Sequence, residues 1–296
     1  MTADFPDYRR KLAFLSLKKS LRGKAGPANL FLSLTDRCDL NCLHCYYRDR
    51  KRRLSLSFGT AKNIIRQARE NGIPQVTFFG GEPSLYPRLA ELAAYADGLG
   101  LFTELDTNGQ SLGRKELREL SRAGLSSVMV SLHSETPGEH DRLTGKTGSH
   151  KRALKFIKDS LKAGLLCYVS ACFFKGNYNR KTLKKFAAFT KKLGAHGIRS
   201  LFFYDNATLP GRPILMAGDI KAMKLEDYVG TCFSSDPGRR KCSGSLNKML
   251  YVGTGGEVKS CPYSRAVMGN IRKTPLFRII PLAKKVPARP VLPCAG

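Results

Sequence analysis

The sequence predicts an α/β protein, with a partial (β/α)6, TIM-like barrel followed by a small Cys-containing β-hairpin unit. Three observations lead to this expectation. Six short apolar stretches alternate with helical stretches, and the helical stretches repeatedly end in glycine, as helix C-termini do. After about residue 215 this alternation stops, while Gly, Pro and Cys become frequent. Six repeats are too few for a closed eight-stranded barrel, so we expect an open one.

The order of the elements supports the parallel arrangement, because strands joined by helices form parallel sheets with right-handed crossovers. The N-terminal residues 1–27 are basic and mildly amphipathic, and they predict an entry helix ended by Gly26 and Pro27; a helix lying on a membrane surface is the alternative. The barrel strands are expected at 29–35, 74–81, 101–109, 126–133, 165–174 and 198–205, and the helices between them at 57–72, 87–100, 114–124, 150–164 and 180–194.

A hairpin is expected over 247–261, where an apolar strand meets a Gly-rich turn and a second short strand. The predicted organisation is therefore an N-terminal helix at 1–27, a barrel at 28–215 and a smaller unit at 216–296. A chain of 296 residues with 42% hydrophobic residues is long enough for this arrangement.

Composition narrows the class of protein. The N-terminus lacks the apolar core of a signal peptide, and no window reaches the ~18 apolar residues of a membrane span, so we expect a cytoplasmic protein. Nine cysteines in such a protein indicate metal or redox chemistry before disulfides. The net charge of +28 favours anionic partners, but the basic residues are spread along the whole chain. A generally solvated basic surface is the preferred interpretation.

Cys38, Cys42 and Cys45 follow the first strand directly, at the end of the barrel where such enzymes place their chemistry. A zinc site completed by His44 or by a distant ligand is one interpretation. The other is an iron–sulfur cubane, in which one C-x3-C-x2-C loop holds three corners and leaves the fourth iron open for a small molecule. The missing fourth ligand is then a vacancy for a substrate or cofactor.

With this loop the chain resembles the radical S-adenosylmethionine (SAM) superfamily. The resemblance implies a partial barrel that holds a 4Fe-4S cluster on Cys38, Cys42 and Cys45. It also implies that SAM chelates the open iron, is cleaved reductively to a 5′-deoxyadenosyl radical, and thereby abstracts a hydrogen atom from a substrate. A flavodoxin- or ferredoxin-type reductant is the expected electron donor.

Further residues carry the resemblance along the barrel. Gly80, Gly81 and Glu82 belong to a GGEP motif after the second strand, which in the superfamily holds the SAM amino group; an ordinary turn with an exposed Glu is the alternative. Thr107 and Asn108 end the third strand. These two residues are expected to line the SAM or substrate pocket, unless they only cap the next helix.

Three more residues are expected to contact SAM. Ser131 ends the fourth strand and is expected at the ribose or the carboxyl end of SAM, helix capping being the alternative here too. The "EHDRLTG" stretch, 139–145, resembles a superfamily loop whose arginine meets the SAM carboxylate, so Arg142 is the candidate; a plain surface arginine is the alternative. His44 precedes the last cysteine of the loop, where an aromatic ring often packs on the adenine.

The C-terminal cysteines resemble the SPASM/twitch extension of the superfamily, in which a hairpin between two cysteines helps hold an auxiliary 4Fe-4S cluster. Cys242 and Cys261 flank the hairpin here, and "MGNI" follows it. Cys294 and Cys232 are the best further ligands, so the resemblance implies a second 4Fe-4S cluster. The alternatives are a truncated chain with an incomplete or absent cluster, and a Cys242–Cys261 disulfide. The remaining Cys167 and Cys172 are expected in the core.

The function expected from these features is that of a radical SAM enzyme that oxidatively modifies a peptide, a protein or an anionic small molecule such as a tetrapyrrole. An RNA-modifying radical SAM enzyme is the second hypothesis, supported by the charge. The third is a non-catalytic zinc protein that binds nucleic acid, which leaves the GGEP motif and the polar strand ends unexplained.

Overall fold

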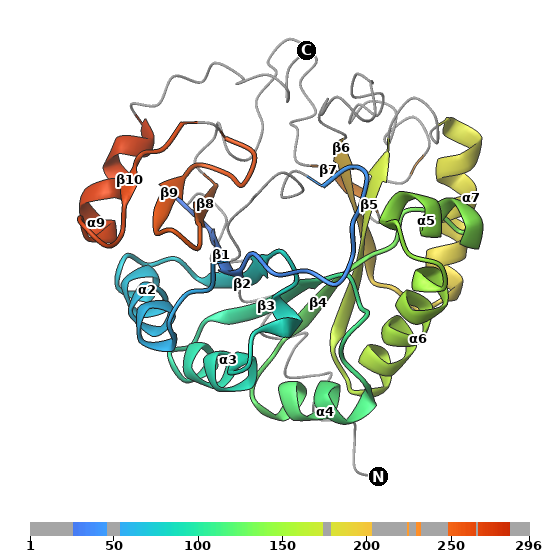
Figure 1. Ribbon diagram of the computed structural model, residues 1–296, viewed down its shortest axis with the longest axis horizontal. Helices are drawn as coiled ribbons and strands as arrows, with labels where there is room; N and C mark the ends of the chain where they lie inside the picture. Colours follow the sequence, from blue (N-terminus) through green and yellow to red (C-terminus); the bar gives the residue numbers. More distant parts are fainter. Residues whose placement is uncertain are drawn as a thin grey trace.

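The structure is a computed structural model that describes residues 26–45, 54–173, 179–202, 224, 229–231, 248–264 and 266–284. Its centre is a sheet in which six parallel strands lie in sequence order and curve into part of a barrel (Figure 1). This arrangement confirms the predicted partial barrel. The six strands are β1 (Asn29–Thr35), β2 (Gln75–Gly80), β3 (Phe102–Thr107), β4 (Ser127–Ser131), β5 (Leu166–Phe173) and β6 (Gly197–Phe202).

Five helices cover the outer face of this sheet, as the periodicity of the sequence predicts (Figure 1). Their buried stripes pack on the outward-facing strand residues to form one large hydrophobic core. Burial of that apolar surface is the main force that holds the two layers together. The five helices are α2 (Phe58–Glu70), α3 (Leu89–Gly98), α4 (Arg114–Arg122), α6 (Ser149–Lys162) and α7 (Arg180–Lys192).

The predicted hairpin is present, but it continues the barrel sheet. Strand β8 (Met249–Val252) pairs with β9 (Glu257–Lys259) in an antiparallel manner and with β1 in a parallel manner. Strand β7 (Val229–Thr231) extends the opposite edge beside β6. The full order is β10-β9-β8-β1-β2-β3-β4-β5-β6-β7, and the short elements around it are β10 (Gly269–Asn270), α9 (Leu276–Ile279), η1 (Pro83–Leu85) and η2 (Ile280–Lys284).

One expectation is wrong in its local structure. The stretch 139–145, expected as a loop, lies in the helix α5 (Pro137–Thr144), which ends at Gly145. Pro137 begins this helix with its preset φ, and Gly145 ends it in the left-handed conformation, at φ 70°. The helix is too short for an apolar period to reveal it in the sequence, because it spans about two turns.

Several predictions concern residues outside the described ranges. The entry helix over 1–27 is one of them, apart from its last two residues, and Cys232, Cys242 and Cys294 are others. Among the described helices, none is both long enough and apolar enough to cross a membrane.

Candidate active site at the mouth of the barrel

A cavity of about 140 Å³ opens at the carboxyl ends of the barrel strands. Parallel strands end at one edge of a sheet, so residues far apart in sequence meet there. The lining includes every residue that the sequence assigned to the first cluster or to SAM, except Arg142: Cys38, Cys42, His44, Cys45, Gly80, Gly81, Glu82, Thr107, Asn108 and Ser131.

The cysteine loop is held by the end of helix α5. The N–H of Leu43 donates to the carbonyl of Leu143 at 2.9 Å, and the N–H of Asn41 donates to the carbonyl of Thr144 at 3.3 Å. These carbonyls lie at the C-terminus of α5, where no intrahelical donor is available to them. The loop and the helix therefore satisfy each other's backbone groups, and the helix fixes where the thiols lie.

The chemistry of the three thiols fits an iron–sulfur cluster. Burial raises the pKa of Cys38 to about 12. Burial also raises the pKa of Cys42, and the neighbouring Cys45 and Cys38 raise it further. A bound metal cation would lower the pKa of these thiols again, because only the thiolate form binds metal. Within the described ranges, no three His, Cys, Asp or Glu side chains converge on one ion. A cubane suits such a set, since each thiolate binds a different iron.

Gly80 and Gly81 let the end of β2 lie directly on the chain that enters the cysteine loop. A Cβ at either position would approach a backbone oxygen to 2.4 Å, that of Thr35 for Gly80 and that of Arg37 for Gly81. The N–H of Gly81 donates to Thr35, and that of Glu82 donates to Arg37, both at 2.7 Å. The two glycines are thus required by the close approach of the backbones as well as by any ligand.

Glu82 lies at the centre of the strand ends and is 1% exposed. Its carboxyl group accepts hydrogen bonds from the Thr107 hydroxyl and the Asn108 N–H, each at 2.7 Å, and from the Ser84 N–H at 2.9 Å. Burial raises the pKa of Glu82 to about 7, although these hydrogen bonds act in the opposite direction. An adjacent ammonium ion would stabilise the ionised form of such a buried carboxyl group.

Asn108 connects this carboxyl network to the cysteine loop. Its side-chain amide donates to Asp39 at 2.7 Å and lies 3.7 Å from the Cys38 sulfur. Asp39 also accepts from the Ser111 hydroxyl at 2.9 Å. The ends of β2 and β3 and the cysteine loop are therefore joined by a continuous set of hydrogen bonds.

Arg142 takes no part in the cavity lining. It lies in α5, about half exposed, and forms an ion pair with Glu139 one turn earlier at 2.9 Å. Ser131, in contrast, lines the cavity at the end of β4. The expected contact between Arg142 and a SAM carboxylate thus stays a prediction, without support from this geometry.

Histidine rings form one wall of the cavity, and the sequence indicated only the first of them. The ring of His44 packs edge-to-face on that of His133 at 4.4 Å between centroids, and His133 stacks on His140 at 5.5 Å. Burial lowers the pKa of His44 and of His140 to about 4, and that of His133 well below its usual value. The wall is therefore uncharged at neutral pH and suits a flat aromatic ligand.

Hydrogen bonds hold two of these rings in place. The ring Nδ1 of His133 accepts from the Cys172 N–H at 3.2 Å, and the ring Nδ1 of His140 accepts from the His133 N–H at 3.1 Å. His44 Nδ1 is buried and has no partner among the described residues. An orphaned polar atom at a cavity wall is a position where a ligand can bind.

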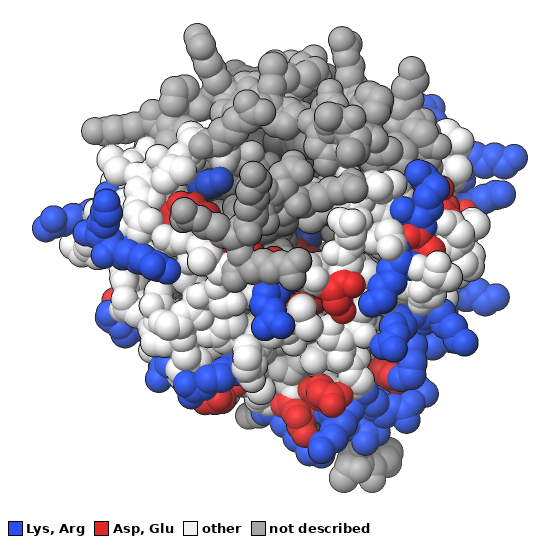
Figure 2. Space-filling view, viewed as in Figure 1, with Lys and Arg blue, Asp and Glu red and all other residues white. Residues whose placement is uncertain are grey.

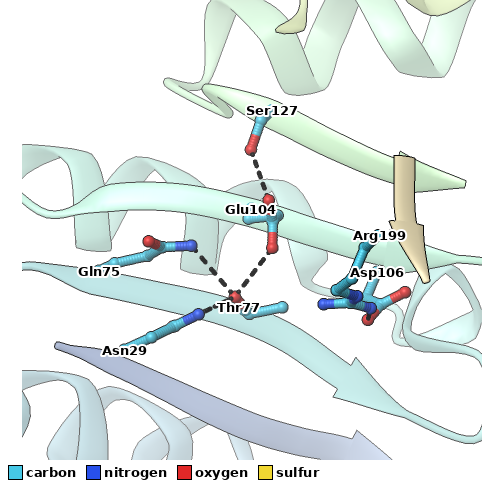
Figure 3. A network of polar contacts seen from close by, with 7 residues as sticks. All are labelled: Asn29, Gln75, Thr77, Glu104, Asp106, Ser127 and Arg199. Atoms are coloured by element: carbon cyan, nitrogen blue, oxygen red, sulfur yellow. Dashed lines mark hydrogen bonds and ion pairs between the residues drawn. The ribbon is translucent and has the colours of Figure 1, made fainter. Parts of the chain in front are cut away.

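A polar layer lies deeper inside the barrel, and the sequence did not indicate it (Figure 3). Glu104 accepts from the hydroxyls of Thr77 and Ser127, each at 3.2 Å. Nearer the mouth, Asp106 forms an ion pair with Arg199 of β6, and both line the cavity. Glu104 and Asp106 are two residues apart, so they share the inner face of β3. This spacing is the signal that could have located them.

Comparison with known proteins agrees with this site. The family described as "Radical SAM superfamily" matches residues 32–189, which include the cysteine loop and the GGEP motif. The PqqA peptide cyclase of Xanthomonas axonopodis pv. citri (strain 306) is 34% identical over 156 residues, 52% of this chain and 42% of the relative. That of Bradyrhizobium diazoefficiens is 32% identical over 157 residues, 52% of this chain and 41% of the relative. The match thus spans less than half the length of these curated relatives.

Solved structures show the same fold. Streptococcus suis SuiB bound to S-adenosylmethionine superposes with a TM-score of 0.70 at 17% identity, over 91% of this chain and 68% of that chain. Native anSMEcpe with bound AdoMet superposes with a TM-score of 0.64 at 14% identity, over 86% of this chain and 80% of that chain.

Proposed function

The chain belongs to the radical SAM superfamily, and on this premise we propose that it cleaves SAM reductively at the mouth of the barrel to modify a peptide oxidatively. The observation that carries the proposal is the convergence of the cysteine loop, the GGEP motif and two further strand ends on one cavity. When bound, a 4Fe-4S cluster supplies the electron that cleaves SAM to methionine and a 5′-deoxyadenosyl radical. The protein supplies position, charge and exclusion of water.

Each part of the lining has a role in this proposal. The thiolates of Cys38, Cys42 and Cys45 hold the cluster. Glu82, ionised, pairs with the SAM ammonium, because its buried carboxyl group faces the cavity beside the cysteine loop. The neutral ring of His44, backed by His133, packs on the adenine.

The peptide substrate is supported by the relatives. Those of similar sequence are named PqqA peptide cyclase, and SuiB and anSMEcpe have been crystallised with peptides. A flavodoxin- or ferredoxin-type protein is the proposed electron donor, and the net charge of +28 favours an anionic partner.

An auxiliary 4Fe-4S cluster is the second part of the proposal. Cys261 follows β9 and is partly exposed. Together with Cys232, Cys242 and Cys294, which lie outside the described residues, it would complete a set of four thiolates. Such a cluster would accept the electron that an oxidative modification releases.

Iron and sulfide analysis after anaerobic reconstitution tests both clusters. We expect about eight irons per chain in the wild type and about four in the Cys38→Ala/Cys42→Ala/Cys45→Ala variant. Cys167→Ala is the matched control, because Cys167 is fully buried in the core and its loss should leave the iron content unchanged. If the wild type holds about four irons per chain and the triple variant holds none, the SAM cluster is retained and the auxiliary cluster is excluded. Zinc in place of iron would contradict the whole proposal.

A further inference from the structure

Two charged side chains meet inside the cavity, and none of the roles above uses them. Asp106 lies near the end of β3 and Arg199 lies on β6, so the pair joins two strands that are separated by β4 and β5 in the sheet (Figure 3). Both line the cavity, where the side chain of Asp106 is 8% exposed and that of Arg199 is 23% exposed. Both side chains are largely buried, yet a ligand in the cavity can reach them.

The ion pair leaves hydrogen-bonding capacity unused. A guanidinium carries several N–H donors in a fixed plane. Arg199 donates a hydrogen bond to Asp106, and Glu104 and Tyr263 lie close enough to act on its charge. Its Nε is buried with no partner among the described residues. Asp106 likewise has one carboxylate oxygen engaged by Arg199. A ligand group that offers an acceptor to this Nε and a donor to the carboxylate would therefore satisfy both side chains.

The charged residues Glu104, Asp106 and Arg199 limit which ligand group can bind here. Glu104 lies two residues before Asp106 on the same inner face, and its own hydrogen bonds go to Thr77 and Ser127. Burial raises the pKa of Glu104, and the guanidinium of Arg199 acts against this rise. A carboxylate ligand would face two acidic side chains, and an ammonium ligand would face Arg199 at close range. An uncharged amide meets neither repulsion.

We propose that Asp106 and Arg199 form a subsite for an uncharged amide of the substrate, whose carbonyl oxygen accepts from Arg199 and whose N–H donates to Asp106. The assignment rests on the proposed function, because it places the substrate in the same cavity as SAM. The amide can be a carboxamide side chain or a peptide bond. A trans peptide bond points its N–H and C=O to opposite sides, whereas a carboxamide presents both on one edge. The adjacent pair therefore favours a carboxamide.

Four small probes of nearly the same shape test this subsite. Acetamide stands for a carboxamide, N-methylacetamide for a peptide bond, acetate for an anion and acetamidinium for a cation. Their dissociation constants are measured by saturation-transfer NMR on the anaerobic, reconstituted protein, with and without SAM. We expect one of the two amides to bind about ten-fold more tightly than either charged probe. The amide that binds more tightly shows whether the recognised group is a carboxamide side chain or a peptide bond.

Variants connect the binding to the pair. In Asp106→Leu/Arg199→Met both charges are replaced together, because removing one alone would leave a buried charge unpaired. We expect amide affinity to fall about ten-fold, while SAM affinity changes less than about two-fold. The control is the same replacement at an exposed pair, Arg66→Met/Glu70→Leu on α2, which should change neither. Should the double variant not fold, Arg199→Lys keeps the ion pair but loses the planar donors, and the same loss of amide affinity is expected.

Two outcomes would overturn the proposal. In the first, a charged probe binds best, or the double variant binds amides as well as the wild type does. In the second, SAM affinity falls together with amide affinity, which would assign the pair to the cofactor. Binding of SAM to the wild type is measured on the same samples. If the wild type does not bind SAM, the proposed function is refuted, and the amide subsite is refuted with it.

Discussion

At the scale of single residues, Glu82 lies at the centre of the site. Its carboxyl group accepts two hydrogen bonds from the end of β3 and one from the Ser84 N–H, and yet it remains on the cavity wall. These donors hold the carboxyl group in one orientation, and its burial keeps water away. Its geometry is thus set before any ligand arrives, which lowers the cost of ordering on binding.

The pKa of Glu82 leads to a prediction about pH. With a pKa of about 7, the carboxyl group is protonated below neutral pH and must lose its proton to pair with the SAM ammonium. The dissociation constant for SAM should therefore rise as the pH falls below about 7, by up to ten-fold per pH unit, and level off above it. Anaerobic calorimetry between about pH 6 and pH 8 measures this dependence.

Glu82→Gln is the control for this prediction, because glutamine has no proton to lose in this range. Above about pH 7 the variant should bind SAM more weakly than the wild type, and its profile should be flat, so that the two converge as the pH falls. A wild-type profile that is equally flat would show that Glu82 does not pair with the ammonium.

At the residue level, motifs in the sequence indicated several residues that the fold brings to one cavity, whereas residues that only the curvature of the barrel brings there were missed. The cysteines and the GGEP residues lie together on the cavity. Asp106 and Arg199 gave no motif, because a contact across three strands depends on the curvature of the sheet. His133 and His140 were missed for a similar reason, since their rings meet only through the placement of α5 beside β4.

At the scale of elements, helix α5 acts as a brace for the cysteine loop. Its final carbonyls accept from the loop backbone, and Gly145 just beyond its end lies against Asn41. The long helices followed from their apolar periods, while α5 was expected as a loop. The element that positions the cluster ligands was thus the one that periodicity could not identify.

Gly145→Ala should displace this brace. A Cβ at Gly145 would lie 2.8 Å from the carbonyl oxygen of Asn41, in a residue whose φ of 70° already disfavours a side chain. We expect a loss of stability of about 1–3 kcal/mol and a faster loss of iron from the SAM cluster. Thermal unfolding and the rate of iron release to a chelator measure the two effects.

Gly138→Ala provides the matched control in the same helix. A Cβ at Gly138 would meet no atom within 4 Å, so neither the melting temperature nor iron release should change beyond the small gain in helix propensity. If both variants release iron at the wild-type rate, α5 does not position the loop.

At the scale of the whole molecule, many of the described basic side chains lie on the outer helices. Lys and Arg side chains gather along the right-hand and lower edges in Figure 2, where Figure 1 places α7, α6 and α4. With 51 Lys and Arg residues against 23 Asp and Glu residues, the chain carries a long-range electrostatic field that attracts anionic partners and is weakened by salt.

The open sheet also offers a place for the proposed auxiliary cluster. The hairpin β8–β9 extends the barrel sheet past β1, and Cys261 follows it directly. A cluster held there would be fixed to the strand that also leads into the first cysteine loop. The sequence predicted the hairpin, but its pairing with β1 is a long-range contact that local patterns do not report.

The measurement that tests the central claim most directly is the formation of 5′-deoxyadenosine and methionine from SAM after anaerobic reduction with dithionite. The account predicts both products from the reconstituted wild type and neither from the Cys38→Ala/Cys42→Ala/Cys45→Ala variant. The Cys167→Ala control should form them at the wild-type rate, because that thiol lies in the core. A reconstituted wild type that holds iron and binds SAM but forms no 5′-deoxyadenosine would contradict the account.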